Sequence, residues 1–70
     1  MNDHASQIGA LVRARRLKLG LRQQELAELA GCSTRFVHTV EAGKATIRLN
    51  KLIDVLEVLG LELTVKVRTT

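Results

Sequence analysis

The stretch that decides the fold of this 70-residue chain is QQELAELAGCSTRFVHTVEAG, from Gln23 to Gly43. It reads as two short helices joined by a tight turn. The inner face of the first helix is formed by four residues at helical spacing, Gln23, Leu26, Ala27 and Ala30. Gly31 then ends this helix, because glycine adopts the left-handed backbone of a helix end at little steric cost.

The second helix of the stretch is predicted from Thr34 to about Ala42, where Gly43 stops it. Ser33 precedes it, and its hydroxyl can accept from the free amides of the first turn. One arc of this helix is apolar and holds Phe36, Val37 and Val40. The opposite arc is polar and holds Thr34, Arg35, His38 and Thr39. Because the apolar arc must dock on the first helix, the polar arc faces outward, where it can bond to base edges. This pattern predicts a helix-turn-helix with an exposed reading surface.

Composition limits the chain to one small domain. A chain this short buries only about 60% of its unfolded surface, so we expect oligomerisation to add stability. Lys and Arg number 11 against 7 acids, and the net charge of +4 with a pI near 10.0 suits an anionic partner, nucleic acid or less often a membrane surface. No apolar run approaches the roughly 20 residues of a spanning helix, and we expect no signal peptide. The single cysteine, Cys32, cannot form an internal disulfide, which fits a reducing cytoplasm.

Residues 1–5 carry no periodic pattern and are expected to form a flexible N-terminus. A helix is predicted next, capped by Ser6 and ended by Gly20. Its apolar stripe is Ile8, Leu11, Val12 and Leu19. Arg16 falls on the same stripe, and a guanidinium aimed at a core needs an anion, because an unpaired buried charge is costly. Glu41, at the core-side edge of the reading helix, is the best candidate; the alternative is that both groups are solvated.

A further helix is predicted from Leu49 to Leu59, after a connector that covers residues 44–48. Its apolar arc is wide for a short surface helix and holds Leu49, Leu52, Ile53, Val55, Leu56 and Leu59. One part of this arc can cover the core of the domain. We expect the remainder to pack against another surface, and Gly60 to end the helix.

The apolar period changes to two after Gly60. Leu61, Leu63, Val65 and Val67 alternate with Glu62, Thr64, Lys66 and Arg68, which is the pattern of a half-buried strand rather than of a frayed tail. A lone strand leaves its ladder groups unmet, so we expect two copies to pair these strands antiparallel about a two-fold axis. The predicted dimer interface comprises Leu52, Leu56, Leu59, Leu61, Leu63, Val65 and Val67. The expected fold is therefore all-α, with four to five helices in residues 6–59, and one C-terminal β-strand in residues 60–70 that pairs across the dimer.

Two family resemblances follow from these residues. The first resemblance is to the Cro/CI-type (XRE) helix-turn-helix of phage repressors. It is carried by the pattern Gln23-x-x-Leu26-Ala27-x-x-Ala30-Gly31-x-Ser33-x-x-x-Val37-x-x-Val40-Glu41-x-Gly43-Lys44. The HipB-like antitoxins are similar over a wider run, from Ile8-Gly9-Ala10-Leu11-Val12 to Leu59-Gly60-Leu61-Glu62-Leu63. The resemblance implies a lambda-repressor-like fold, a partly buried ion pair between the residues matching Arg16 and Glu41, an intersubunit strand pair, and a HipA-like kinase toxin as partner.

The polar arc supplies the candidate base readers. A two-fold dimer would place two reading helices about 34 Å apart, so a palindromic operator in double-stranded DNA is expected. Arg35 is the strongest reader, because its guanidinium can pair with O6 and N7 of a guanine. Thr34 and Thr39 can hydrogen-bond or touch a thymine methyl. Ser33 can cap the helix or contact a phosphate or base. His38 is expected beside a phosphate or base.

Phosphate contacts are expected from Gln23, Lys44 and Arg22. Gln23 lies at a helix N-terminus, where free amides and the helix dipole favour an anion. Arg22 occupies the N-cap position, and arginine cannot accept from an amide, so this cap should be weaker by about 1 kcal/mol. Two interpretations of Arg22 stay open. Either the lost cap is offset by a contact between Arg22 and a DNA phosphate, or arginine is simply tolerated at this surface position. Three more basic residues, Arg13, Arg15 and Lys18, lie away from the inner stripe of the first helix. They could form a general positive field, but a solvated face is expected.

The sequence favours a dimeric, sequence-specific repressor, and its antitoxin role is implied by resemblance alone. The alternative is a protein-interaction module that neutralises a toxin or other acidic partner without reading bases. An enzyme is not expected, because no nucleophile–base pair, carboxylate pair or phosphate loop is present. No cofactor or metal is expected either, since His4, His38 and Cys32 do not form a converging ligand set. RNA binding is disfavoured by the lack of exposed stacking aromatics.

Overall fold

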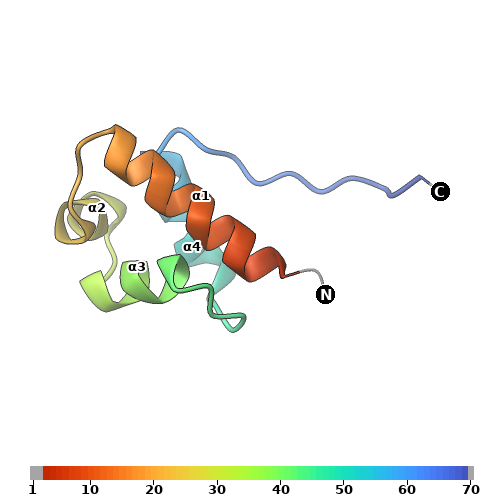
Figure 1. Cartoon of the computed structure of the whole chain (residues 1–70), viewed down its shortest axis with the longest axis horizontal. Helices are drawn as coiled ribbons and strands as arrows, with labels where there is room; N and C mark the ends of the chain where they lie inside the picture. The colour runs from red at the N-terminus through yellow and green to blue at the C-terminus, as the bar shows by residue number, and fades with distance from the viewer. Residues whose placement is uncertain (1–2, 70) are drawn as a thin grey trace.

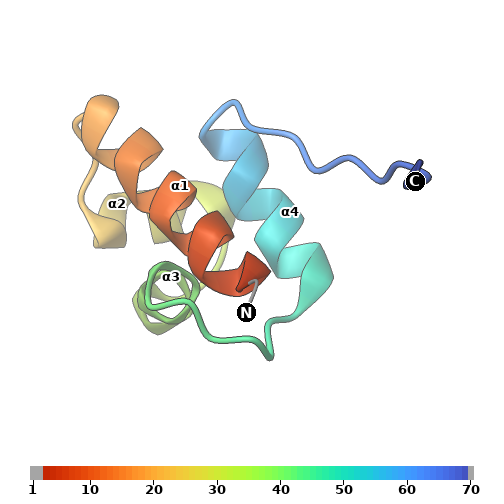
Figure 2. The ribbon, with the colours of Figure 1, turned by 45° about the vertical axis from the view of Figure 1, so that its right-hand side comes forward.

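The computed structural model describes residues 3–69, which form four helices and an extended C-terminal segment (Figure 1). The helices are α1 (His4–Lys18), α2 (Gln23–Ala30), α3 (Thr34–Glu41) and α4 (Leu49–Val58). α3 packs against α1 and α2, and α4 packs against α2. Figure 2 shows α1 crossing in front of α2, with α3 below it and α4 beside it. The predicted all-α helical architecture of four to five helices is confirmed, with four helices in residues 3–69. Within the described residues, no helix is long and apolar enough to cross a membrane.

The core lies where the inner faces of the four helices meet. It consists of buried aliphatic side chains, Val12, Leu26, Ala27, Val37, Val40, Leu52, Val55, Leu56 and Leu59. Burial of a side chain of the Val or Leu type contributes about 1.5–3 kcal/mol, so this cluster is the main source of the stability of the domain. The helix-turn-helix is therefore supported from behind by α1 and α4.

The start of α1 differs from the prediction. Asp3 is the N-cap, and its carboxylate accepts from the Ser6 backbone N–H at 3.0 Å and from the Ser6 hydroxyl at 2.7 Å. The predictions that Ser6 caps this helix and that His4 and Ala5 are loose are therefore wrong. A carboxylate is the stronger cap because it accepts charge-assisted hydrogen bonds and complements the helix dipole. Met1 and Asn2 lie outside the described residues.

The inner face of α1 also differs from the predicted stripe. Leu11 and Leu19 are 57% and 46% exposed, so their assignment to this face is wrong. The α1 residues that turn toward the core are Ile8, Gly9, Val12 and Arg16. Gly9 lies where α1 crosses α3, and a β-carbon at this position would overlap the carbonyl oxygen of Val40. A glycine is needed here because the two helix backbones approach more closely than a side chain allows.

The C-terminal segment does not form the predicted strand. It leaves the helical body in an extended path (Figures 1 and 2), and no strand occurs within the described residues. Leu61 is half-buried against the core, whereas Val65 and Val67 are 95% and 93% exposed. A β-ladder needs a second extended edge, and the four helices of one protomer do not offer one.

Three of the residues predicted at the dimer interface on α4 are buried within the protomer. Leu52, Leu56 and Leu59 are only 7%, 6% and 1% exposed, because they already pack in the core of the protomer. The outward aliphatic residues of α4 are instead Leu49 and Ile53. The wide apolar arc of this helix thus serves the core with one side and leaves the other side uncovered.

Candidate nucleic-acid interface

The turn between α2 and α3 is fixed by hydrogen bonds at both helix ends. Gly31 has a φ of +71°, and its N–H donates to the carbonyl of Glu28. Ser33 caps α3, since its hydroxyl accepts from the Phe36 backbone N–H at 3.0 Å. These bonds end α2 and begin α3 with a single residue between the two caps, and the packing of α3 against α2 sets the relative orientation of the helices.

The polar arc of α3 faces solvent. Val37 and Val40, on the opposite arc, are buried at 0% and 3% exposure. The candidate base readers Ser33, Thr34, Arg35 and His38 are exposed, and Thr39 is half-buried. Phe36 is half-buried against the core. The structure therefore presents the predicted reading residues together on one open surface.

Thr39 is restricted in what it can offer to a base. Its hydroxyl donates to the carbonyl oxygen of Arg35 at 2.8 Å, one helical turn earlier. This back-bond uses the single hydroxyl hydrogen, so only an acceptor lone pair and the methyl group remain. A thymine methyl contact suits Thr39 better than donation to a base acceptor.

Arg16 lies against Glu41 beneath the C-terminal end of α3. The guanidinium donates from Nε to Glu41 Oε2 at 2.6 Å and from Nη2 to Oε1 at 3.0 Å, and from Nη1 to the Leu21 carbonyl at 2.8 Å. The two side chains are 9% and 4% exposed. The expected pair is thus bidentate and buried, and it ties α1 to α3.

The ion pair also shifts both ionisation equilibria. Burial alone would raise the pKa of Glu41, but the hydrogen bonds from Arg16 and Gln23 outweigh it, and the pKa lies below its ordinary value. The hydrogen bond to Glu41 raises the pKa of Arg16. The charged forms of both groups are therefore stabilised in the folded protein.

Gln23 takes part in this network rather than reaching freely toward solvent. Its side-chain amide donates to Glu41 Oε1 at 3.0 Å. One donor of the side chain expected at a phosphate is thus used inside the protein. Contacts to an anion at this end of α2 fall mainly to the backbone amides of the first turn.

Arg22 makes no side-chain cap to α2, as expected for a residue that cannot accept from an amide. Its own backbone N–H instead donates to Glu25 Oε1 at 2.8 Å, and its side chain is 80% exposed with Nε 3.3 Å from the same oxygen. These hydrogen bonds lower the pKa of Glu25. The carboxylate three residues after the cap position is a signal that the sequence contained and the prediction missed.

The remaining basic residues divide between surface and scaffold. Lys44 is exposed immediately after the turn that follows α3. Arg15, expected on a solvated face, instead donates from Nε to the Leu59 carbonyl at 2.8 Å and so satisfies the C-terminal end of α4. That expectation is wrong for Arg15, because a basic side chain can complete the free carbonyls of a nearby helix end.

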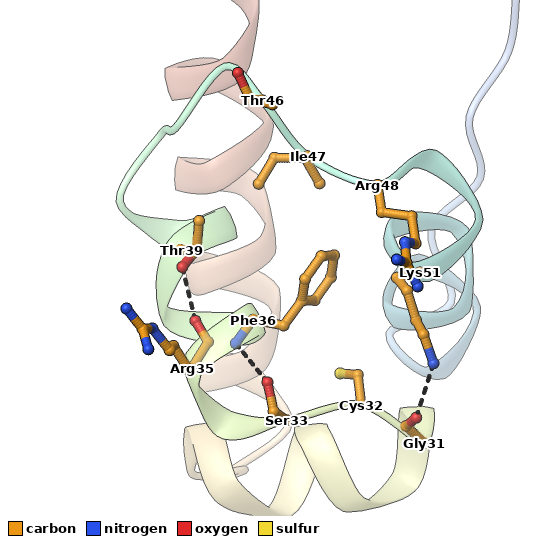
Figure 3. Close-up of a pocket in the computed structure, with 10 residues that line it drawn as sticks. All are labelled: Gly31, Cys32, Ser33, Arg35, Phe36, Thr39, Thr46, Ile47, Arg48 and Lys51. Atoms are coloured by element: carbon orange, nitrogen blue, oxygen red, sulfur yellow. Dashed lines mark hydrogen bonds between the residues drawn. The ribbon is translucent and has the colours of Figure 1, made fainter.

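A hollow of about 740 Å³ adjoins the reading surface (Figure 3). It lies between α3 and the first turn of α4. Arg48 and Lys51 line it from the α4 side, and neither was identified as a site residue from the sequence. The ring of Phe36 faces it from α3 (Figure 3). Lys51 Nζ is 3.3 Å from the Gly31 carbonyl oxygen, so this lysine reaches back to the turn.

The described residues contain no group of three or more His, Cys, Asp or Glu side chains able to hold a metal ion. Cys32 is a free thiol in the turn before α3, and burial raises its pKa. The thiol is therefore protonated near neutral pH and is a poor nucleophile.

Comparisons with known proteins agree with this geometry. A family described as a helix-turn-helix domain matches residues 7–67. An uncharacterized HTH-type transcriptional regulator from Sinorhizobium fredii is 51% identical over 53 residues, which are 76% of this chain and 70% of that protein. A solved structure described as an MDT protein superposes with a TM-score of 0.81 at 22% identity, and the match covers 93% of this chain and 92% of the other. At that identity the superposition shows the fold alone.

Proposed function

This chain belongs to the helix-turn-helix domain family and is a DNA-binding transcription regulator, and from this premise we propose that it is a repressor that reads an inverted-repeat operator as a dimer. The observation that carries the proposal is the exposed polar arc of α3, held outward by its buried apolar arc. Ser33, Thr34, Arg35, His38 and Thr39 supply donors, acceptors and methyl groups at the width of a helix that fits the major groove.

Charge around this arc favours DNA. Arg22, Arg35 and Lys44 are exposed near the two ends and the centre of the helix-turn-helix. Cations at such positions release counterions from the duplex when they meet its phosphates, which supplies affinity without sequence information. Arg35 is the residue that we assign to a guanine, and the other two are assigned to the backbone.

Arg35→Ala tests the base-reading proposal. Operators are first obtained by selection of the protein's preferred duplexes from a random pool, and binding is then followed by fluorescence anisotropy. We expect a loss of about 1–3 kcal/mol, roughly 10- to 100-fold in affinity, and relaxed preference at one base position. Lys66→Ala, which removes one charge from the C-terminal segment, is the matched control and should keep that preference. Equal preference in Arg35→Ala and the parent would refute the assignment.

Lys44→Ala tests the phosphate assignment in a different way. A backbone contact carries no sequence information, so this variant should weaken binding to all duplexes alike. The slope of log affinity against log salt should also decrease by about one unit. A change in base preference with an unaltered slope would contradict the assignment.

The dimer is proposed because of the aliphatic surface on the opposite side of the protomer. Leu49 and Ile53 of α4 and Leu63 of the C-terminal segment are each more than a third exposed, beside a hollow of about 410 Å³. Residues 61–68 still carry the alternation of a half-buried strand. A second copy would supply both the missing strand edge and the cover for these side chains.

The antitoxin role rests on the resemblance of the wider run to the HipB-like antitoxins. We propose a HipA-like kinase toxin as the partner and no catalytic activity in this chain. The test is co-purification with the product of an adjacent reading frame, if that product is kinase-like. The alternative is a module that neutralises a toxin or other acidic partner without reading bases. It predicts that Arg35→Ala leaves this neutralisation intact and that the parent protein selects no duplex.

A further inference from the structure

The hollow between α3 and α4 has walls of two kinds (Figure 3). On one side, Arg48 extends from the position just before α4 and Lys51 from the first turn of this helix. The Phe36 ring, from α3, and the Ile47 side chain, from the connector before α4, form an apolar wall. Both of these apolar residues are half-buried and rest on the core, so the wall is held in place. The volume of about 740 Å³ lies within the range of small-molecule sites, about 300–1,000 Å³.

The cations of the hollow have no anionic partner. Neither Arg35 nor Arg48 makes a side-chain hydrogen bond or ion pair within residues 3–69, and the only bond of Lys51 Nζ there is to the Gly31 carbonyl. None of the residues that line the hollow is acidic. Asp54, one helical turn after Lys51, is near enough to Cys32 to raise the pKa of that thiol, but it does not line the hollow. The charged groups that do line the hollow are all cationic, so the site favours an anionic occupant.

We propose that this hollow binds a small aromatic anion. Its carboxylate, sulfonate or phosphate group would lie between Arg48 and Lys51, and its ring would lie against Phe36 and Ile47. A bare phosphodiester backbone fits less well, because it would cover the cations and leave the apolar wall in water. The two halves of the site thus specify a ligand that has both a charge and a flat apolar group.

Occupation of the hollow would interfere with DNA. Ser33, Arg35 and Thr39 line the hollow and also belong to the proposed reading surface. A ligand held there and a duplex compete for the same side chains, so the ligand would release the operator. This regulatory half rests on the proposed function, whereas binding of the ligand does not.

The probe for the site is 1-anilinonaphthalene-8-sulfonate, a fluorescent aromatic anion, titrated into the full chain without DNA. We expect saturable binding at one site, and an affinity at least tenfold lower in the double variant Arg48→Gln/Lys51→Gln. The matched control, Lys66→Gln/Arg68→Gln, removes the same charge from the C-terminal segment and should bind like the parent. Equal affinity in the first variant and the parent would overturn the proposal.

A second measurement locates the dye independently of the variants. In ¹H–¹⁵N spectra, the amides of Cys32, Phe36 and Lys51 should shift with the same dissociation constant as the fluorescence. Shifts confined to the exposed aliphatic surface near Leu63 and Val65 would place the dye elsewhere and overturn the site. Phe36→Leu should lower the affinity of the dye while the far-ultraviolet circular dichroism stays that of the parent.

Competition separates this proposal from the proposed function. A selected operator duplex should displace the dye from the parent protein, and the dye should lower the apparent affinity for the duplex. If the protein bound no duplex selectively, the proposed function would fail, while the dye titration would still decide the site. If the double variant lost DNA affinity and no dye bound to the parent, the hollow would belong to the DNA backbone and the proposal would be wrong.

Discussion

The helix-turn-helix side of the molecule and the side formed by α4 and the C-terminal segment meet solvent in opposite ways. On the first side, polar groups that turn inward have partners, as Arg16 has Glu41 and Leu21, and the exposed arc of α3 is polar. On the second side, aliphatic groups face water, and Val65 and Val67 are almost fully exposed.

This difference separates contacts that one chain completes from contacts that it leaves open. The caps, turn and ion pair of the helix-turn-helix side join residues whose partners are all in the same protomer. We call this the closed side, and we call the side formed by α4 and the C-terminal segment the open side. The alternation of apolar and polar residues in 61–68 is typical of a strand that pairs with another strand, and one protomer does not supply that second strand. We infer that the contacts completed within the protomer determine the fold, and that the aliphatic surface left exposed on α4 and the C-terminal segment determines with what the fold assembles.

The largest expected effect is on the closed side. Arg16→Met should lower the free energy of unfolding by about 3 kcal/mol, because it leaves a buried carboxylate with only Gln23 as donor. Urea denaturation at pH 7 measures this loss. The double variant Arg16→Met/Glu41→Leu removes both charges and should recover most of it. A loss of less than about 0.5 kcal/mol, the level of ordinary surface changes, would mean that the pair is solvated.

Gly9→Ala should have the next largest effect on the closed side. The added methyl would overlap the Val40 carbonyl oxygen and lie 3.0 Å from that of Glu41, so α1 and α3 would have to separate. Overpacking of this kind costs about 1–3 kcal/mol. The measurement is the urea midpoint, with Ala10→Ser on the exposed side of α1 as control. An unchanged midpoint in Gly9→Ala would show that the helices can part without cost.

Acid should weaken the same side by less than Arg16→Met does. The folded pKa of Glu41 is lowered, so the unfolded chain takes up a proton first as pH falls below the ordinary value of about 4.5. The contribution of this carboxylate is thus complete at neutral pH and is lost as pH falls through the folded pKa. Glu41→Gln should show a shallower decline in unfolding free energy between pH 6 and 3 than the parent, over roughly the interval in which a carboxyl titrates. Parallel curves would contradict the assignment.

The closed side is also the part that the sequence predicts well. Gly31 and Ser33 act through neighbours within four residues, and the apolar arc of α3 is recognised by a spacing of three or four residues, so these signals are local. Arg16 was identifiable over a longer distance because a charge on an apolar stripe requires an opposite charge. The polar arc of α3 follows from the same helical period, which is why the candidate readers lie together.

The errors lie where two signals compete or where the partner is not local. Aspartate and serine are both common N-cap residues, and at the start of α1 the N-cap is Asp3 rather than Ser6. The Asp3 carboxylate accepts two hydrogen bonds from Ser6 at once. Leu11 and Val12 fit the same stripe on paper, but the close crossing at Gly9 turns the face of α1 toward Val12. Periodicity identifies an apolar face, but it does not say which residues of a wide apolar arc pack in the core. Leu52, predicted at the dimer interface, is buried in the core of the protomer.

The smallest effect on folding is expected for substitutions on the open side. These substitutions also test most directly whether the two sides differ. Val65→Thr/Val67→Thr keeps two β-branched residues but removes their apolar surface, and both positions are more than 90% exposed in the protomer. The free energy of unfolding of the isolated protomer should therefore change by less than about 0.5 kcal/mol. Sedimentation equilibrium should nevertheless show a weaker dimer, because the removed surface is the surface that a second copy would cover. A destabilised protomer with unchanged association would mean that these residues pack within one chain, and the division between a closed and an open side would be wrong.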